Sequence, residues 1–424
     1  MQHQGLHTLS LLIVVWAQAL SVAAQNTPWL DSLITSLPSY QRHIAEAPDD
    51  FELQVLYRPL DGPDSNKTFT YGLAPDRYFY PASTVKLPMA ALALQHLNEL
   101  SVLGLTSGSP MRQSQLGELK ELAALGLTPM LPASSDLTGS SDPRTHERVG
   151  MPGTPATVMG HVRDIAIVSS NEAYNRLYQW IGPRYAEEEF ARRGWTARII
   201  ARLGAPAYNA FSNRLLNPTA FLHVMTEHGD TVYYRGPSMQ PATAQLRLTG
   251  QVKGRGFYHD ASQQVIRKPF DFSSKNFIPL TDLANTLQAI VAPETMDSHL
   301  RFRMREEDRD AFVYALRTPP RDSDNPLHHS KPDGYVNFLY YGGDGDWEFG
   351  GPLIYNKVGD AYGYLTDVAI FEDPYTGHRY LLAATIHVNA NGIYNDGNYE
   401  YEEIGLPYLK ELGRAIWARR RAGG

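Results

Sequence analysis

Alternating apolar and polar residues near the amino-terminal end predict two β-strands. The first covers Phe51 to Tyr57 and the second Thr68 to Tyr71, and each has the two-residue period of a strand with one buried face. An apolar pattern from Met89 to Leu100 follows. Because apolar residues on all sides are typical of a helix surrounded by protein, this segment is predicted to be a buried helix.

The middle of the chain has mainly helical spacing. A helix is predicted from Ala156 through Trp180 and is expected to end at Gly182-Pro183, since glycine and proline terminate helices. Further helices are expected from Leu216 to His228 and from Thr281 onward. These segments indicate a largely helical region between the two ends of the chain.

The last third of the chain returns to strand patterns. Strands are predicted at Leu353 to Asn356, Thr366 to Phe371 and Tyr380 to Val388, followed by a helix from Leu406 to Arg421. Strands at both ends with helices between them predict an α/β fold of the α+β type. In this fold one antiparallel sheet, built from both chain ends, is flanked by helices and joined to an all-α lobe.

The first residues predict export. The apolar run Leu9 to Val22 is followed by Ala23-Ala24, which is the pattern of a secretory signal peptide comprising residues 1–24. An uncleaved membrane anchor is the alternative. Signal peptides usually have positively charged residues before the apolar run, and here only His3 and His7 take that place. No later stretch is apolar enough to span a bilayer, so no stable membrane insertion is expected after signal cleavage.

The rest of the chain is predicted to form one catalytic domain. Residues 25–50 are expected to be a helix or linker that precedes a domain of residues 51–424. Two segments within that domain, near 106–155 and 229–279, are rich in turn-forming residues or lack a sustained period. They are interpreted as insertions.

Charge and cysteine content indicate which binding partners and which cellular compartment to expect. The chain has 38 Lys and Arg against 45 Asp and Glu, a net charge of −7. Because no positive excess exists to neutralise phosphates, nucleic acid is not expected as a partner. The chain has no cysteine, so an oxidising compartment leaves it unchanged, and a periplasmic or secreted location is expected.

The strongest chemical signal is Ser83-Thr84-Val85-Lys86 at the start of the predicted buried helix. Residues i and i+3 of a helix share a face, so the Ser83 hydroxyl and the Lys86 amine are expected within roughly 2.6–3.2 Å, or somewhat farther apart without a ligand. A buried, neutral amine can take the hydroxyl proton and make Ser83 a nucleophile. The pattern also fits a capping serine and a surface lysine, but the apolar neighbours of Lys86 and the proline at position 88 favour a functional site.

A second motif, Ser169-Ser170-Asn171, lies in the middle of the helical region. A hydroxyl and an amide two residues apart on a tight turn can point into the same cleft. Ser169 is then a candidate to relay a proton to the leaving group, and Asn171 a candidate to hold the substrate or Lys86. The pattern is weak by itself.

A third motif, Lys357-Val358-Gly359, lies on a predicted strand in the last third of the chain and is followed by Asp360. Lys357 at a cleft supplies positive charge for a substrate carboxylate, and Gly359 lets a substrate come close to the backbone. The alternative is an ordinary edge-strand lysine beside a turn.

Together and in this order, the three motifs resemble those of penicillin-recognising serine enzymes, and their flanks are most similar to class A β-lactamases. The resemblance covers roughly residue 51 to the carboxyl terminus and implies a β-lactamase/transpeptidase-like fold. It implies that Ser83 is acylated and that Lys86 and Ser169 transfer protons.

The same resemblance implies how the substrate is held. Asn171 and Lys357 position it, and the backbone N–H groups of Ser83 and Asp360 form an oxyanion hole. Asn217 matches the asparagine of the family's Glu-x-x-Leu-Asn loop. No cofactor and no metal are expected, because neither His328-His329 nor the acidic residues 344–348 have the spacing of a metal site.

Two residues depart from the family pattern. Val358 replaces the family's Thr or Ser, which removes a hydroxyl that grips the substrate carboxylate. Asn213 stands where the family's glutamate activates the deacylating water, and an amide cannot act as a base. Glu172 is a conceivable substitute, although a solvent-facing role fits it equally well.

The sequence therefore predicts an exported serine hydrolase that acts on a β-lactam or a related amide or ester and deacylates slowly. The expected substrate is a small molecule or resembles peptidoglycan. A D-alanyl peptidase or esterase of the same superfamily is one alternative, and a non-catalytic penicillin-binding-like protein is the other. Both alternatives are favoured by Asn213 and Val358.

Overall fold

The computed structural model describes most of the chain between residues 27 and 423. The described ranges are 27–65, 67–109, 111–114, 157–204, 216–217, 221–225, 231–235, 238–239, 246–259, 262–345 and 347–423. The predicted signal peptide, most of the first predicted insertion and Asn213 lie outside them.

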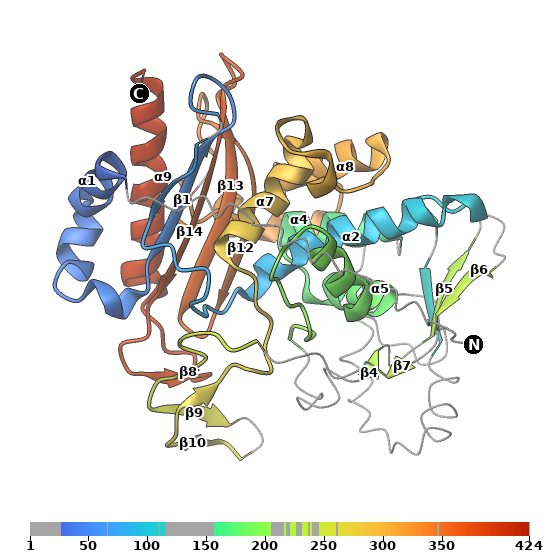
Figure 1. The fold of residues 1–424 in the computed structure, drawn as a ribbon, viewed down its shortest axis with the longest axis horizontal. Coiled ribbons are helices and arrows are strands. Elements are labelled where there is room, and N and C mark those ends of the chain that lie inside the picture. Colours follow the sequence, from blue (N-terminus) through green and yellow to red (C-terminus); the bar gives the residue numbers. More distant parts are fainter. Residues whose placement is uncertain are drawn as a thin grey trace, which may run out of the picture.

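A five-stranded antiparallel sheet forms the centre of the molecule, in the order β12-β13-β14-β1-β2 (Figure 1). Its strands come from both chain ends: β1 (Gln54–Pro59), β2 (Phe69–Tyr71), β12 (Leu353–Ala361), β13 (Tyr364–Glu372) and β14 (Arg379–His387). The amino-terminal strand β1 pairs with β14, with Leu56 opposite Ala383. The predicted fold class, with one antiparallel sheet built from both chain ends, is confirmed.

The turn between β12 and β13 has only two residues, Tyr362 and Gly363. Both have positive φ angles, 55° and 81°, which is the conformation of the tightest hairpin turns. Glycine adopts it without strain, whereas Tyr362 must be held in it by its surroundings. Lys275 contributes, because its amine donates to the Tyr362 hydroxyl over 3.2 Å.

Helices cover both faces of the sheet. On one face lie α1 (Pro28–Ser36) and α9 (Leu406–Arg421), and on the other lies α7 (Leu280–Val291) (Figure 1). A cluster of buried apolar side chains joins Leu409 and Leu412 of α9 to Leu382 and Ala384 of the sheet. Alternate sheet residues thus pack on opposite layers, as the two-residue period of the strands requires.

The remaining long helices form the all-α lobe beside the sheet (Figure 1). They are α2 (Lys86–Glu99), α4 (Val158–Val168), α5 (Asn171–Arg192) and α8 (Glu306–Leu316). The helix predicted from Ala156 through Trp180 is therefore two helices. The expected stop at Gly182 is a break, with φ of 77°, after which the helix continues. No helix among the described residues combines the length and the apolar character needed to cross a bilayer.

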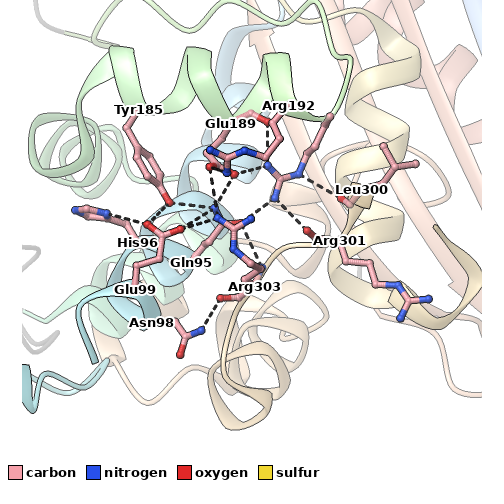
Figure 2. A network of polar contacts seen from close by, with 11 residues as sticks. Gln95, His96, Asn98, Glu99, Tyr185, Glu189, Arg192, Leu300, Arg301 and Arg303 are labelled. Atoms are coloured by element: carbon pink, nitrogen blue, oxygen red, sulfur yellow. Dashed lines mark hydrogen bonds and ion pairs between the residues drawn. The ribbon is translucent and has the colours of Figure 1, made fainter. Parts of the chain in front are cut away.

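A buried polar network joins α2 to α5 inside this lobe (Figure 2). The Glu189 carboxylate accepts from Arg193 and from Gln95, each over 2.7 Å, and Arg193 also donates to the Gln95 side-chain oxygen over 2.8 Å. All three side chains are buried. Each buried charge therefore has a partner, which holds the two helices in one relative position.

Short strands form small sheets outside the central one. They are β3 (Met111–Ser114), β4 (Leu216–Asn217), β5 (Phe221–Met225), β6 (Thr231–Arg235), β7 (Ser238–Met239), β8 (Val252–Lys253), β9 (Gly256–His259), β10 (Gln264–Ile266), β11 (Phe270–Asp271) and β15 (Ile393–Tyr394). The helix predicted from Leu216 to His228 is wrong, because β4 and β5 occupy this segment. Phe221 and Val224 favour a strand, and β5 gains partners in β3 and β6 that local spacing does not reveal.

Single helical turns connect these elements. They are η1 (Tyr40–Ile44), η2 (Pro48–Phe51), η3 (Ala82–Val85), η4 (Ser101–Leu103), η5 (Pro293–Thr295), η6 (Ser298–Leu300), η7 (Pro320–Asp322), η8 (Pro326–Ser330), η9 (Asp333–Val336) and η10 (Tyr401–Gly405).

Candidate active site

Ser83 lies in the turn η3, which leads directly into α2. The preceding Ala82 has a φ of 45°, in the left-handed region that non-glycine residues rarely adopt. Strained backbone of this kind persists only where the surrounding structure holds it, and it gathers at functional sites. Because α2 begins at Lys86, Pro88 falls in its first turn, where a missing N–H costs nothing.

The edge strand β12 packs directly against this turn at Gly359. A Cβ atom at Gly359 would lie 2.6 Å from the Pro81 carbonyl oxygen and 2.8 Å from the Ser83 backbone nitrogen. These distances are too short for any side chain. The glycine therefore allows strand and serine turn to approach each other, whereas the sequence analysis expected it to admit substrate.

Ser169 ends α4 in a left-handed conformation, with φ of 57° and ψ of 39°. Its backbone carbonyl accepts from the Lys86 amine over 2.5 Å, and its hydroxyl oxygen accepts from the same amine over 3.2 Å. The neighbouring Ser170 has a different task, because its hydroxyl caps α5 by accepting from the Ala173 N–H. Of the two adjacent serines, Ser169 is the one that contacts the lysine.

Lys357 brings a second amine to the same hydroxyl. Its Nζ donates to Ser169 Oγ over 2.8 Å and to the Val358 carbonyl oxygen over 2.9 Å. The structure thus brings together one residue from each of the three sequence motifs: Lys86, Ser169 and Lys357.

Burial lowers the pKa of both lysines, neither of which is exposed to solvent. Burial lowers the pKa of Lys86 well below its ordinary value, the nearby Lys357 lowers it further, and Asp360 raises it. Burial likewise lowers the pKa of Lys357 to about 7, against the opposing effects of Asp360 and Asp367. A buried lysine with a lowered pKa can accept a proton near neutral pH.

The expected contact between Ser83 and Lys86 is not present among the hydrogen bonds of these two residues. A buried amine needs acceptors for its protons, and Ser169 offers both a carbonyl and a hydroxyl oxygen. In the structure the Lys86 amine therefore lies at Ser169.

A cleft of about 380 Å³ lies beside Ser83. Four of its lining residues are predicted site residues: Ser83, Ser169, Asn171 and Asp360. The others described are Tyr335, Val336, Phe338, Gly343, Asp344, Val358, Leu365, Tyr401, Glu402 and Leu406. The cleft is thus bounded by the serine motifs, by β12 and by two segments that sequence reasoning did not connect to the site.

The remaining predicted residues are placed as follows. Asn171 begins α5. Its side-chain amide lies so close to Gly204 that a Cβ atom at that glycine would come within 2.5 Å of the amide nitrogen. Asn217 ends β4, and its side chain lies outside the description. Glu172 has its carboxylate 4.0 Å from the guanidinium of Arg176, one turn along α5. This ion pair supports a structural role for Glu172.

Asp367 is a buried residue behind the site that the sequence analysis missed. Its carboxylate accepts from the backbone N–H groups of Phe338 and Leu339 and from the Asn356 amide. Burial raises the pKa of Asp367 to about 6, although these hydrogen bonds lower it. It connects β13 to the segment that forms one cleft wall, and the signal for it was a lone carboxylate within an apolar strand.

No group of three His, Asp or Glu residues in the described part of the chain has the arrangement of a metal site.

Replacing Ser169 by alanine or by glycine is expected to lower activity equally but to change stability differently. Ser169→Ala and Ser169→Gly both remove the hydroxyl that accepts from the two amines, so each should slow the acylation of Ser83 that the sequence motifs predict by roughly 10²-fold. Glycine also relieves the left-handed backbone, so Ser169→Gly should be more stable than Ser169→Ala by roughly 0.5–1 kcal/mol. Stopped-flow acylation and urea unfolding measure the two effects. Wild-type acylation in both variants would remove Ser169 from the proton path.

Comparisons with known proteins find similar solved structures at low sequence identity only. No protein-family model and no curated protein sequence matches the chain. Among solved structures, the chain is similar to PBP-A, with 14% identity and a TM-score of 0.48 over 94% of this chain and 98% of that one.

Two β-lactamases are similar at the same level. The enzyme from Sphaerobacter thermophilus has 13% identity and a TM-score of 0.45, over 91% of this chain and 94% of its own. The enzyme from Streptomyces albus G has 12% identity and a TM-score of 0.42, over 91% and 97%. These values carry no assignment of their own, and the α/β fold class rests on the sheet and helices described above.

Proposed function

We propose that the protein is an exported serine hydrolase that forms an acyl-enzyme at Ser83. The observation that carries this proposal is the position of the Ser169 hydroxyl. It accepts hydrogen bonds from two buried lysine amines, in a cleft that Ser83 also lines. A buried amine with a lowered pKa beside a serine hydroxyl can act as the base that activates a serine nucleophile.

The proposed reaction begins when the Ser83 oxygen attacks the carbonyl carbon of an amide or ester. The hydroxyl proton passes to the neutral amine of Lys86, and backbone N–H groups stabilise the charge on the carbonyl oxygen. The bond to the leaving group then breaks, and the leaving nitrogen or oxygen receives a proton through Ser169. Water finally hydrolyses the ester at Ser83 and regenerates the hydroxyl.

The proposed substrate is a β-lactam or a related amide or ester. Acylation uses residues that are present, whereas deacylation needs a base for the water. Asn213 stands at the position of that base in the class A pattern, so we infer that the acyl-enzyme persists. The proposed location is the periplasm or the exterior, where peptidoglycan-like substrates occur.

A D-alanyl peptidase or esterase is the second candidate. Val358 favours it, because this buried side chain lines the cleft with methyl groups where the class A pattern has a hydroxyl. A binding protein without turnover is the third candidate. Ser83 and Ser169 line one cleft, and the buried Lys86 amine donates to Ser169, which supports the two enzymes over the binding protein.

Time-resolved labelling with a fluorescent penicillin tests the proposal. We expect label on the wild-type protein that persists after free penicillin is removed, and none on Ser83→Ala. Ser101→Ala, which changes an exposed serine after α2, is the matched control and should label normally. Rapid loss of label would indicate efficient hydrolysis, and label on Ser83→Ala would contradict the assignment of the nucleophile.

A further inference from the structure

A buried contact between His328 of η8 and Asp164 of α4 lies behind the candidate site. We propose that His328 is a positioning residue, which acts through Asp164 to hold Ser169 where its hydroxyl meets the two lysine amines. This inference rests on the proposed function, because Ser169 belongs to the same Ser83 site. It gives a role to a histidine that the proposed mechanism does not use.

The backbone carbonyl of Asp164 fixes the end of α4. It accepts from the N–H of Ser169 and from that of Ser170, the latter over 3.1 Å. Bonds of this kind close a helix on a left-handed residue, and here that residue is Ser169, whose hydroxyl accepts from both amines. The position of the Ser169 hydroxyl therefore depends on the position of Asp164.

The side chain of Asp164 is anchored by His328. The Asp164 carboxylate is fully buried, and one of its oxygens lies 3.4 Å from Nε2 of His328, which is also buried. Losing a partner is costly for a buried carboxylate. A change at His328 should therefore move Asp164 and, with it, the last turn of α4.

His328 is held by its own turn. Its Nδ1 is hydrogen-bonded to the hydroxyl oxygen of Ser323 over 2.8 Å, and its backbone N–H donates to the Asn325 carbonyl over 3.0 Å. The side chains of Ser323 and Asn325 are both buried. The ring of His328 thus has a fixed place from which Nε2 reaches Asp164.

The same turn is close in sequence to one wall of the cleft. Only Lys331 and Pro332 separate η8 from η9, and Tyr335 and Val336 of η9 line the cleft. The contact between η8 and α4 therefore connects the segment that forms this wall to the helix that ends at the serine motif.

A cavity of about 140 Å³ beside the contact leaves room for movement. Its lining includes Asp164 and Ile167 of α4 and His328 of η8. Close packing resists displacement, whereas a cavity permits it. The end of α4 can therefore shift when the contact is lost, and a shift of about 1 Å in a catalytic group can cost roughly 10²-fold in rate.

Two substitutions of His328 separate its two ring contacts. A glutamine amide reaches about as far as Nε2 of histidine and can donate to Asp164, whereas an asparagine amide reaches only about as far as Nδ1 and can bond Ser323. We expect His328→Asn to slow acylation of Ser83 by a fluorescent penicillin by roughly 10²-fold. His328→Gln should keep most of the wild-type rate.

His329→Asn is the matched control. It makes the same change in the exposed neighbour, whose Nε2 donates to the Ser323 carbonyl oxygen over 2.8 Å, and it should acylate at the wild-type rate. A wild-type rate in His328→Asn would overturn the proposal. A loss in His328→Gln as large as in His328→Asn would overturn the role of the contact with Asp164.

The final amount of label separates positioning from unfolding. A displaced Ser169 lowers the rate constant while every molecule can still be labelled, whereas partial unfolding lowers the labelled fraction. Should His328→Asn fail to fold, Asp164→Asn replaces it in each comparison, because it removes the charge from the same contact. It should slow acylation at full labelling, and a wild-type rate would again overturn the proposal.

A double-mutant cycle tests whether His328 acts through Ser169. In a Ser169→Ala background the hydroxyl is already absent, so His328→Asn should slow acylation little further. The same loss in both backgrounds would overturn the action through Ser169.

The lysine amines report the position of Ser169 without any catalysis. In protein that contains isotope-labelled lysine, the Cε NMR signals of Lys86 and Lys357 should move in His328→Asn and stay in place in His329→Asn, because both amines donate to the Ser169 hydroxyl. Unmoved signals in His328→Asn would overturn the positioning role. Signals that move in a protein whose wild type takes no penicillin label would overturn the proposed function alone.

Discussion

Lys86→Met is expected to slow the acylation of Ser83 by roughly 10²–10⁴-fold, the usual contribution of a proton-transferring group. Methionine fills a similar volume and suits a fully buried position, so the fold should survive the change. The amine, which donates to both oxygens of Ser169, is lost. Stopped-flow measurement of acylation by a fluorescent penicillin gives the rate.

The pH dependence of the same rate reports on the amine. Since burial and Lys357 lower the pKa of Lys86, the acylation rate of the wild-type protein should rise with pH as the amine loses its proton. Lys86→Met should lose this rise. Lys67→Met, at an exposed lysine that pairs with Asp64, is the control and should keep the wild-type profile. An unchanged rate and profile in Lys86→Met would exclude the amine as the base.

Asn213→Glu is expected to speed deacylation by roughly 10²–10⁴-fold, because it supplies a carboxylate to activate the attacking water. Asn213 lies outside the described residues. This expectation therefore rests on the sequence match of residues 213–217 to the class A loop. The loss of label from pre-acylated protein measures the rate. Acylation itself should change little.

Asn213→Gln is the matched control, because it lengthens the side chain without adding a base, and it should leave deacylation slow. Rapid turnover by the wild-type protein that persists in Asn213→Ala would contradict the loop assignment. Glu172 would then need testing, although its carboxylate lies beside Arg176.

The elements whose pattern is local were predictable from the sequence. The helix predicted from Leu406 to Arg421 has these bounds in the structure. The three carboxyl-terminal strands lie at the predicted places, although the first continues beyond Asn356 to Ala361. Local pattern succeeds there because short apolar runs are typical of strands buried on both faces. The segment from Leu216 failed because its strands depend on partners that are distant in the sequence.

The candidate site was predictable in part. Three motifs located Ser83, Ser169 and Lys357, because each has a recognisable spacing. The opposite wall of the cleft was not predictable, since Asp344 and Glu402 belong to no recognisable motif and lie far from Ser83 in the sequence. Nor did spacing reveal that the Lys86 amine lies at Ser169, because a side chain's choice among acceptors depends on the folded surroundings.

The length of the two-residue turn between β12 and β13 determines which residues of β12 reach the site. Its length sets the register of β12, in which Lys357 lies opposite Val368 and Gly359 opposite Thr366. A shift of one residue would turn the lysine to the opposite face of the sheet and bring a side chain against the Ser83 turn. The positions of Lys357 and Gly359 thus depend on the length of this hairpin turn. An insertion or deletion in the turn should disrupt the site, whereas changes of loop length elsewhere should be better tolerated.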